Sequence, residues 1–158
     1  MKRIRLVALA ALLLAGCGVA PSGPAADGDA PTGVAPGVTL YFVDAHRRLQ
    51  PQLRETGRLG TIAEAVSLLL NGPGGSGMDT EIASTQVTQV VVTTEPGLIQ
   101  LLVPLTDREV TPLGIDQVVC TALGVHVQSG GSRDTKVRIS FTQPTPESDV
   151  QRTCPLNT

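Results

Sequence analysis

The chain of 158 residues has few of the side chains on which aromatic cores, metal centres and nucleic-acid interfaces depend. It has no tryptophan, one tyrosine and two phenylalanines, so any core must be mostly aliphatic. Two histidines and three cysteines leave little for a zinc site, which takes three or four protein ligands. With a formal net charge of −2, the chain also lacks the dense positive charge that nucleic-acid binding requires. We therefore expect no metal, no cofactor and no nucleic-acid partner.

The sequence also lacks an apolar run long enough to cross a bilayer. Residues 6–15 form its main apolar run, about half of the roughly twenty residues that a transmembrane helix needs. This run follows the basic start Met-Lys-Arg-Ile-Arg5, which is the order of a secretory signal peptide. Leu14-Ala15-Gly16-Cys17 then matches the lipobox pattern Leu-small-Gly-Cys, whose cysteine accepts lipid. We expect residues 1–16 to be a lipoprotein signal peptide; the alternative is an ordinary signal peptide that contains a cysteine.

Lipid on Cys17 would hold the mature chain at the outer face of a bacterial cytoplasmic membrane, because two acyl chains give lasting attachment. Residues 17–37 have no aromatic residue and no apolar periodicity, so we expect a flexible tether. Loss of Lys2, Arg3 and Arg5 would change the formal net charge from −2 to −5. The excess of arginine over lysine is typical of GC-rich bacterial genomes, such as those of actinobacteria.

Two cysteines remain after lipidation. Outside the membrane, Cys120 and Cys154 are expected to form a disulfide bond. It would pin a C-terminal tail, residues 144–158, in which Pro144 and Pro146 are expected to prevent regular structure. The competing interpretation is a reactive Cys120 thiol with His126 as its base. The two lie six residues apart on an expected helix, so their side chains would point in different directions.

Hydrophobic patterning predicts one folded domain over residues 38–143. Thr61 and Glu64 form a capping box at the start of a helix that ends at Asn71-Gly72-Pro73. Thr111-Pro112 opens a second helix, which ends at Gly124 or continues through Val127. Strands are expected at residues 38–43, 86–94, 98–103 and 136–141, and a polar loop with four arginines follows the first strand.

The predicted order is strand, helix, strand, strand, helix, strand. This order indicates an α+β fold, with a mixed or antiparallel four-stranded sheet and two helices on one face. Right-handed crossovers would place the first and third strands centrally, with the last strand beside the first.

Several motifs together resemble the GerMN domain of sporulation, germination and envelope proteins. They are the strand Leu40-Tyr41-Phe42-Val43, the segment Leu49-x-Pro51-x-x-Arg54, the helix end Leu69-Leu70-Asn71-Gly72-Pro73 and the later run Gln117-Val-Val-Cys-Thr121-Ala-Leu123. The resemblance spans about residues 38–141. It implies a compact α/β domain similar to ring-building modules, which acts by protein–protein association in the cell envelope.

Candidate chemistry is sparse. Asp44 and His46 could be two ligands of a metal site, but no third ligand is evident nearby, and a loop histidine is the favoured interpretation. Asp107 and Glu109 could flank a substrate, although solvated loop acids explain them better. No nucleotide fingerprint or phosphate loop occurs, so no catalytic residue is assigned.

A cluster of arginines is the remaining candidate site. Arg47, Arg48, Arg54 and Arg58 crowd twelve residues of an acidic chain and could bind an anionic partner. The alternative is a solvated loop. The sequence favours a non-catalytic interaction or scaffold module with an unidentified envelope partner or with itself. A small ligand carrier or enzyme acting on wall or lipid material is the second hypothesis.

Overall fold

The computed structural model describes residues 37–156 of the chain. The expected signal peptide, Cys17 and nearly all of the tether lie outside the described residues. The elements follow in the order β1 (Gly37–Val43), β2 (Leu49–Glu55), α2 (Ile62–Leu70), β3 (Val91–Glu95), β4 (Leu98–Leu102), η2 (Asp107–Glu109), α3 (Pro112–Gln128), β5 (Lys136–Ser140), η3 (Pro146–Asp149) and β6 (Gln151–Arg152). The predicted class is confirmed: the domain is a small α+β fold with two α-helices.

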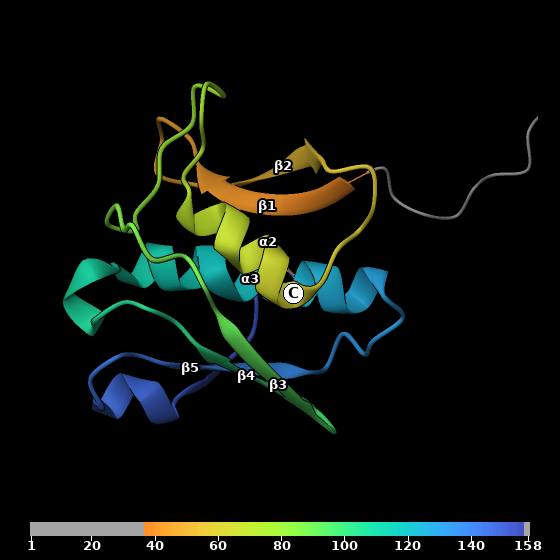
Figure 1. Cartoon of the computed structure of the whole chain (residues 1–158), viewed down its shortest axis with the longest axis vertical. Coiled ribbons are helices and arrows are strands. Elements are labelled where there is room, and N and C mark those ends of the chain that lie inside the picture. Colours follow the sequence, from red (N-terminus) through yellow and green to blue (C-terminus); the bar gives the residue numbers. More distant parts are fainter. Residues whose placement is uncertain (1–36, 157–158) are drawn as a thin grey trace, which may run out of the picture. The chain divides into compact units, whose positions relative to one another are not determined.

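The two α-helices form a layer between two separate sheets (Figure 1). On one side lies the two-stranded β1–β2 hairpin, and on the other lies a four-stranded sheet in the order β3-β4-β5-β6. In the four-stranded sheet β4 and β5 run parallel and the other pairs run antiparallel, so the sheet is mixed. Leu40 and Phe42 of β1, Leu69 of α2 and Ile99 of β4 are fully buried in the core between the layers.

The prediction of a polar loop after β1 is wrong, because residues 49–55 form strand β2. Its side chains are mostly polar and it contains Pro51, so the sequence gives a weak strand signal. Pro51 lies opposite Tyr41 in the hairpin, and no strand of the described residues lies on the other side of β2. Proline is tolerated at an edge because its missing N–H is not needed there.

The predicted strand order is also wrong, since β5 does not pair with β1. The edge of β1 that would receive another strand is occupied by helix α3 and the segment around Asp79. Thr121 Oγ1 accepts a hydrogen bond from the Tyr41 N–H at 3.1 Å, and Gln117 Nε2 donates to the Tyr41 carbonyl at 2.9 Å. Val43 exchanges two backbone hydrogen bonds with Asp79, at 2.9 and 2.8 Å. These contacts close the edge, and β5 pairs with β4 instead.

Both helix starts agree with the sequence. Thr61 and Glu64 form the predicted capping box, with the Thr61 N–H donating to Glu64 Oε2 at 2.7 Å. Helix α3 begins after Thr111 and continues past Gly124 to Gln128. A Cβ atom at position 124 would lie 3.6 Å from the Tyr41 ring, so this glycine lies where the helix passes β1 and does not end the helix.

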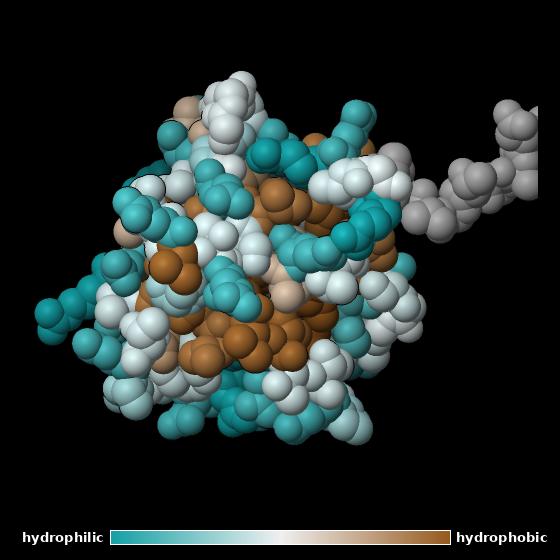
Figure 2. All heavy atoms as spheres, viewed as in Figure 1, coloured by the Kyte–Doolittle hydropathy of each residue, from teal (hydrophilic) through white to brown (hydrophobic). Residues whose placement is uncertain are grey.

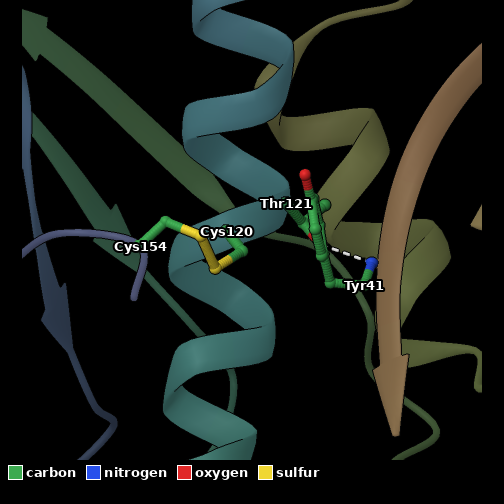
Figure 3. The surroundings of a disulfide bond; sticks show 4 residues. All are labelled: Tyr41, Cys120, Thr121 and Cys154. Carbon is green, nitrogen blue, oxygen red and sulfur yellow. Dashed lines mark hydrogen bonds between the residues drawn. A yellow bond between two sulfur atoms is a disulfide. The ribbon is translucent and has the colours of Figure 1, made fainter. Parts of the chain in front are cut away.

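Cys120 and Cys154 form the expected disulfide bond, and both cysteines are buried. Figure 3 shows Cys120 directed towards the tail while the adjacent Thr121 points to the opposite side of α3, towards Tyr41. The expectation of an irregular tail is wrong: η3 and the short strand β6 lie within it, and β6 pairs with β5. Pro146 fits because it occupies the first turn of η3, where no N–H donor is required.

Candidate functional site

The structure separates the four arginines that are adjacent in sequence. Arg47 and Arg48 lie in the turn before β2, Arg54 lies on β2, and Arg58 lies beyond its far end. A seven-residue strand spans about 20 Å, so the two ends of the hairpin present different surfaces. The cluster seen in the sequence is therefore not a single cationic patch around one point.

Asp44 organises the turn that carries Arg47 and Arg48. Its Oδ1 accepts the backbone N–H groups of His46 and Arg48, at 2.8 and 2.9 Å. Its Oδ2 accepts from Arg48 Nε at 3.3 Å and from Gln50 Nε2 at 3.1 Å. Led by the Arg48 N–H, these donors lower the pKa of Asp44 to about 2. The Asp44 carboxylate thus serves the turn, and His46 is an exposed residue within it.

Each exposed arginine of the segment has an acidic partner in the same chain. Arg47 has a positive φ of 58° and reaches Glu81 at 3.1 Å, and Arg48 reaches Asp44 at 3.2 Å. Arg58 pairs with Glu64 of the α2 capping box through two contacts, at 2.5 and 3.1 Å.

Arg54 differs from the other three, because it is half-buried and its buried Nη2 atom has no hydrogen-bond partner in the part of the chain that the structure describes. It lies opposite Val38 in the hairpin, on the face of the hairpin that carries the buried side chains of β1. This position favours a structural role for Arg54 over a contact with a partner.

A groove of about 530 Å³ runs along helix α2. Its apolar wall includes Leu59, Ala63, Leu68 and Val90, and the Arg58–Glu64 ion pair lies at its rim. Figure 2 shows apolar surface on the face where Figure 1 places α2 and the start of β3. Its volume lies within the range typical of small-molecule pockets, and its lining is mostly apolar, as in such pockets.

The free edges of the two sheets differ in how they are closed. Side chains of α3 and the backbone of Asp79 close the β1 edge, and Pro51 interrupts the β2 edge. Strand β6 is only two residues long. The fourth edge is formed by β3 and the segment before it (residues 86–94 are called the β3 edge), and within residues 37–156 no strand pairs with its outer side.

The β3 edge carries none of the usual devices that block pairing. From Ala83 to Thr94 the sequence has no charged residue, no proline and no glycine. Natural edge strands commonly carry lysine, proline or a bulge that discourages pairing with another chain. The side chains of Val87 and Val91 are nevertheless 58% and 55% exposed.

The catalytic candidates are engaged in local structure. Cys120 is in the disulfide and therefore offers His126 no free thiol, and His126 Nε2 lies 3.1 Å from Thr135 Oγ1. Glu109 caps the turn at Thr106, whose N–H donates to the Glu109 carboxylate at 2.7 Å and lowers its pKa. Within residues 37–156, no three His, Cys, Asp or Glu side chains are grouped so that they could hold a metal ion.

In the same span, no helix is both long and apolar enough to cross a membrane.

Comparison with models of protein families, with curated proteins and with solved structures found no match for this chain. The exposed β3 edge is a candidate surface that was not predicted from the sequence. The signal that could have found it is the uncharged run of twelve residues from Ala83 to Thr94.

Proposed function

We propose that the chain is an envelope lipoprotein, held by lipid on Cys17 at the outer face of a bacterial cytoplasmic membrane. Its folded domain would be a non-catalytic protein-interaction module of the GerMN type. The lipobox and the tether-like composition of residues 17–37 support the location. The chemical test is mass spectrometry of the mature N-terminal peptide. A diacylglyceryl group on Cys17, with residues 1–16 absent, is expected; an unmodified Cys17 thiol would contradict the proposal.

The GerMN interpretation is supported by a contact between two of the motifs that carry the resemblance. The Tyr41 backbone, from the first motif, is held by the Gln117 and Thr121 side chains of the last motif. Both side chains are completely buried. Such a contact gives the two motifs a common structural purpose and explains why they would occur together.

The interaction role is carried by one observation, the unprotected β3 edge with its exposed valines. An uncharged edge strand can bind an extended segment of another protein through main-chain hydrogen bonds. The test is to place a photo-reactive amino acid at Gln89 in the full-length protein and to irradiate intact membranes. The same amino acid at exposed Gln128, at the end of α3, is the matched control.

We expect discrete protein adducts from position 89 and none of the same size from position 128. Adducts that are identical at both positions, or no adduct at either, would contradict an interaction role for the β3 edge. A third position, Arg58, reports separately on the rim of the groove.

The groove along α2 favours a second candidate function, a small ligand carrier. Leu59, Ala63 and Leu68 could hold an apolar group while the Arg58–Glu64 pair contacts a polar end. Native mass spectrometry of the protein extracted from membranes tests this hypothesis. A bound small molecule that is lost in Ala63→Trp, a variant that fills the groove, would favour the carrier.

A further inference from the structure

The unpaired part of the β3 edge already has the side-chain alternation of a strand. Residues 86–94 are predicted as one strand, but pairing with β4 covers Val91–Glu95 alone. Strand β4 ends at Leu102, and Pro104 has no N–H to extend the ladder. Before Val91 the burial pattern still alternates, with Val87 and Gln89 exposed and Val90 buried. Residues 86–90 (the overhang) therefore continue the alternation of β3 but pair with no other strand among the described residues.

The backbone of the overhang is free to pair. The two-residue turn at Pro96-Gly97 makes Glu95 and Leu98 the hydrogen-bonded pair that closes the hairpin. Alternate residues then direct their N–H and C=O groups away from β4, which places those of Thr88, Val90 and Val92 on the outer side. Among the described residues, Thr88 and Val90 have no backbone hydrogen-bond partner.

The exposed side chains of this edge and of the neighbouring Leu102 on β4 form a small apolar surface. Val87, Val91 and Leu102 are 58%, 55% and 49% exposed, and Val91 lies opposite Leu102 in the β3–β4 hairpin. A hollow of about 510 Å³ lies beside them, lined also by Pro104 and Phe141. An apolar surface next to unpaired backbone is suited to a second strand whose own exposed side chains are apolar.

We propose that the β3 edge pairs antiparallel with the β3 edge of a second copy of this chain, about a two-fold axis at Gln89. The inference rests on the proposed interaction role and names its partner. In this register Val87 of each copy lies opposite Val91 of the other, and the two Gln89 side chains face each other. Thr88 and Val90 exchange main-chain hydrogen bonds across the axis.

Three features of the edge make a second copy the partner that fits. Because residues 83–94 carry no charge, the edge does not repel itself when it is duplicated. The register places non-hydrogen-bonded pairs at Val87–Val91, where opposite side chains approach most closely. A two-fold contact uses the same surface on both copies, so the assembly closes as a dimer and cannot grow into a fibre. Tethering to one membrane surface would further raise the effective concentration of the two edges.

The test is disulfide crosslinking of Gln89→Cys in the full-length, lipidated protein in native membranes. A residue on the two-fold axis faces its own copy, so mild oxidation should give a covalent dimer. Gln128→Cys, at an exposed position on α3, is the control. We expect its dimer yield to be at least about tenfold lower than that of Gln89→Cys. Addition of Val91→Lys to the Gln89→Cys protein should lower dimer yield about tenfold, since each dimer then carries two unfavourable pairs.

Leu53→Lys is the matched control for that charge, because Leu53 is 51% exposed on the other sheet. It should leave the dimer yield unchanged. Retention of the Cys120–Cys154 disulfide, read by thiol labelling, establishes that each variant is folded. Equal dimer from Gln89→Cys and Gln128→Cys, or a dimer insensitive to Val91→Lys, would overturn the proposed pairing.

The two proposals can fail separately. No Gln89→Cys dimer, together with photo-adducts of a different protein at position 89, would overturn self-pairing and leave the interaction role standing. No Gln89→Cys dimer and no photo-adduct at position 89 would overturn both.

Discussion

At the free edge of β1, the backbone N–H and C=O of Tyr41 are hydrogen-bonded by side chains of α3 and not by a neighbouring strand. These side chains are Gln117 and Thr121. Gln117 is completely buried, and its amide bridges two backbone groups that are far apart in sequence. Its Nε2 donates to the Tyr41 carbonyl at 2.9 Å, and its Oε1 accepts from the Glu81 N–H at 2.8 Å. One side chain therefore fixes the hairpin and the segment around Glu81 against α3.

We predict that Gln117→Leu destabilises the domain by about 2–4 kcal/mol, because two partly buried backbone groups lose their partners at once. Gln100→Leu is the control: the Gln100 amide donates to Glu95 near the surface at 2.9 Å, and its loss should cost about 0.5 kcal/mol or less. Urea unfolding followed by circular dichroism measures both changes. Similar losses for the two variants would contradict the bridging role.

At the scale of the elements, the sequence predicts those whose signal is local. The capping box of Thr61 and Glu64 predicts α2, and β-branched and aromatic residues predict β1. The tight turn at residues 95–97 predicts the hairpin that contains β4, and apolar alternation predicts β5. Strand β2 is missed because its stability comes from pairing with β1 and not from its own polar residues. The strand order is missed for a related reason: Gln117 and Thr121 close the β1 edge only after α3 has packed there. Tertiary contacts also decide where the arginines lie, so their adjacency in sequence is misleading.

Because Glu64 of the α2 capping box has a lowered pKa, the free energy of unfolding should depend on pH in the acid range. The pKa of Glu64 falls from 4.5 to about 2, chiefly because Arg58 donates to its carboxylate and also because the Thr61 N–H does so. A carboxylate with a lowered pKa in the folded state stabilises that state above pH 4.5. This contribution is lost as the pH falls from about 4.5 towards 2, because the unfolded chain takes up the proton first.

We predict that Glu64→Gln flattens the loss of unfolding free energy between pH 4.5 and pH 2.5, compared with the natural chain. Arg58→Gln should flatten the same interval in part, because it removes the largest cause of the shift while leaving the Thr61 contact. Denaturant unfolding at three pH values in this range measures the slopes. Parallel slopes for all three proteins would exclude the Glu64 carboxylate as a source of the acid sensitivity.

For the molecule as a whole, the disulfide and the expected export signal are independent features, and both indicate an oxidising compartment outside the cytosol. Cys120 lies in α3 and Cys154 follows β6, so the bond ties the end of the chain to the central helical layer. Disulfides persist in oxidising compartments and are rare in the reducing cytosol. A domain with this bond is therefore suited to an oxidising compartment outside the cytosol, to which the expected signal peptide would send it.

Closure of a loop with a separation of 34 residues should contribute about 4 kcal/mol by chain entropy. We predict that the double variant Cys120→Ala, Cys154→Ala loses about 3–4 kcal/mol of unfolding free energy. The loss should also be uneven: hydrogen exchange should rise most in η3 and β6, which the bond anchors, and least in the β1–β2 hairpin. Reduction of the natural protein should reproduce the same exchange pattern. Uniform exchange throughout residues 37–156 would mean that the bond stabilises the domain globally and that the tail needs no anchor.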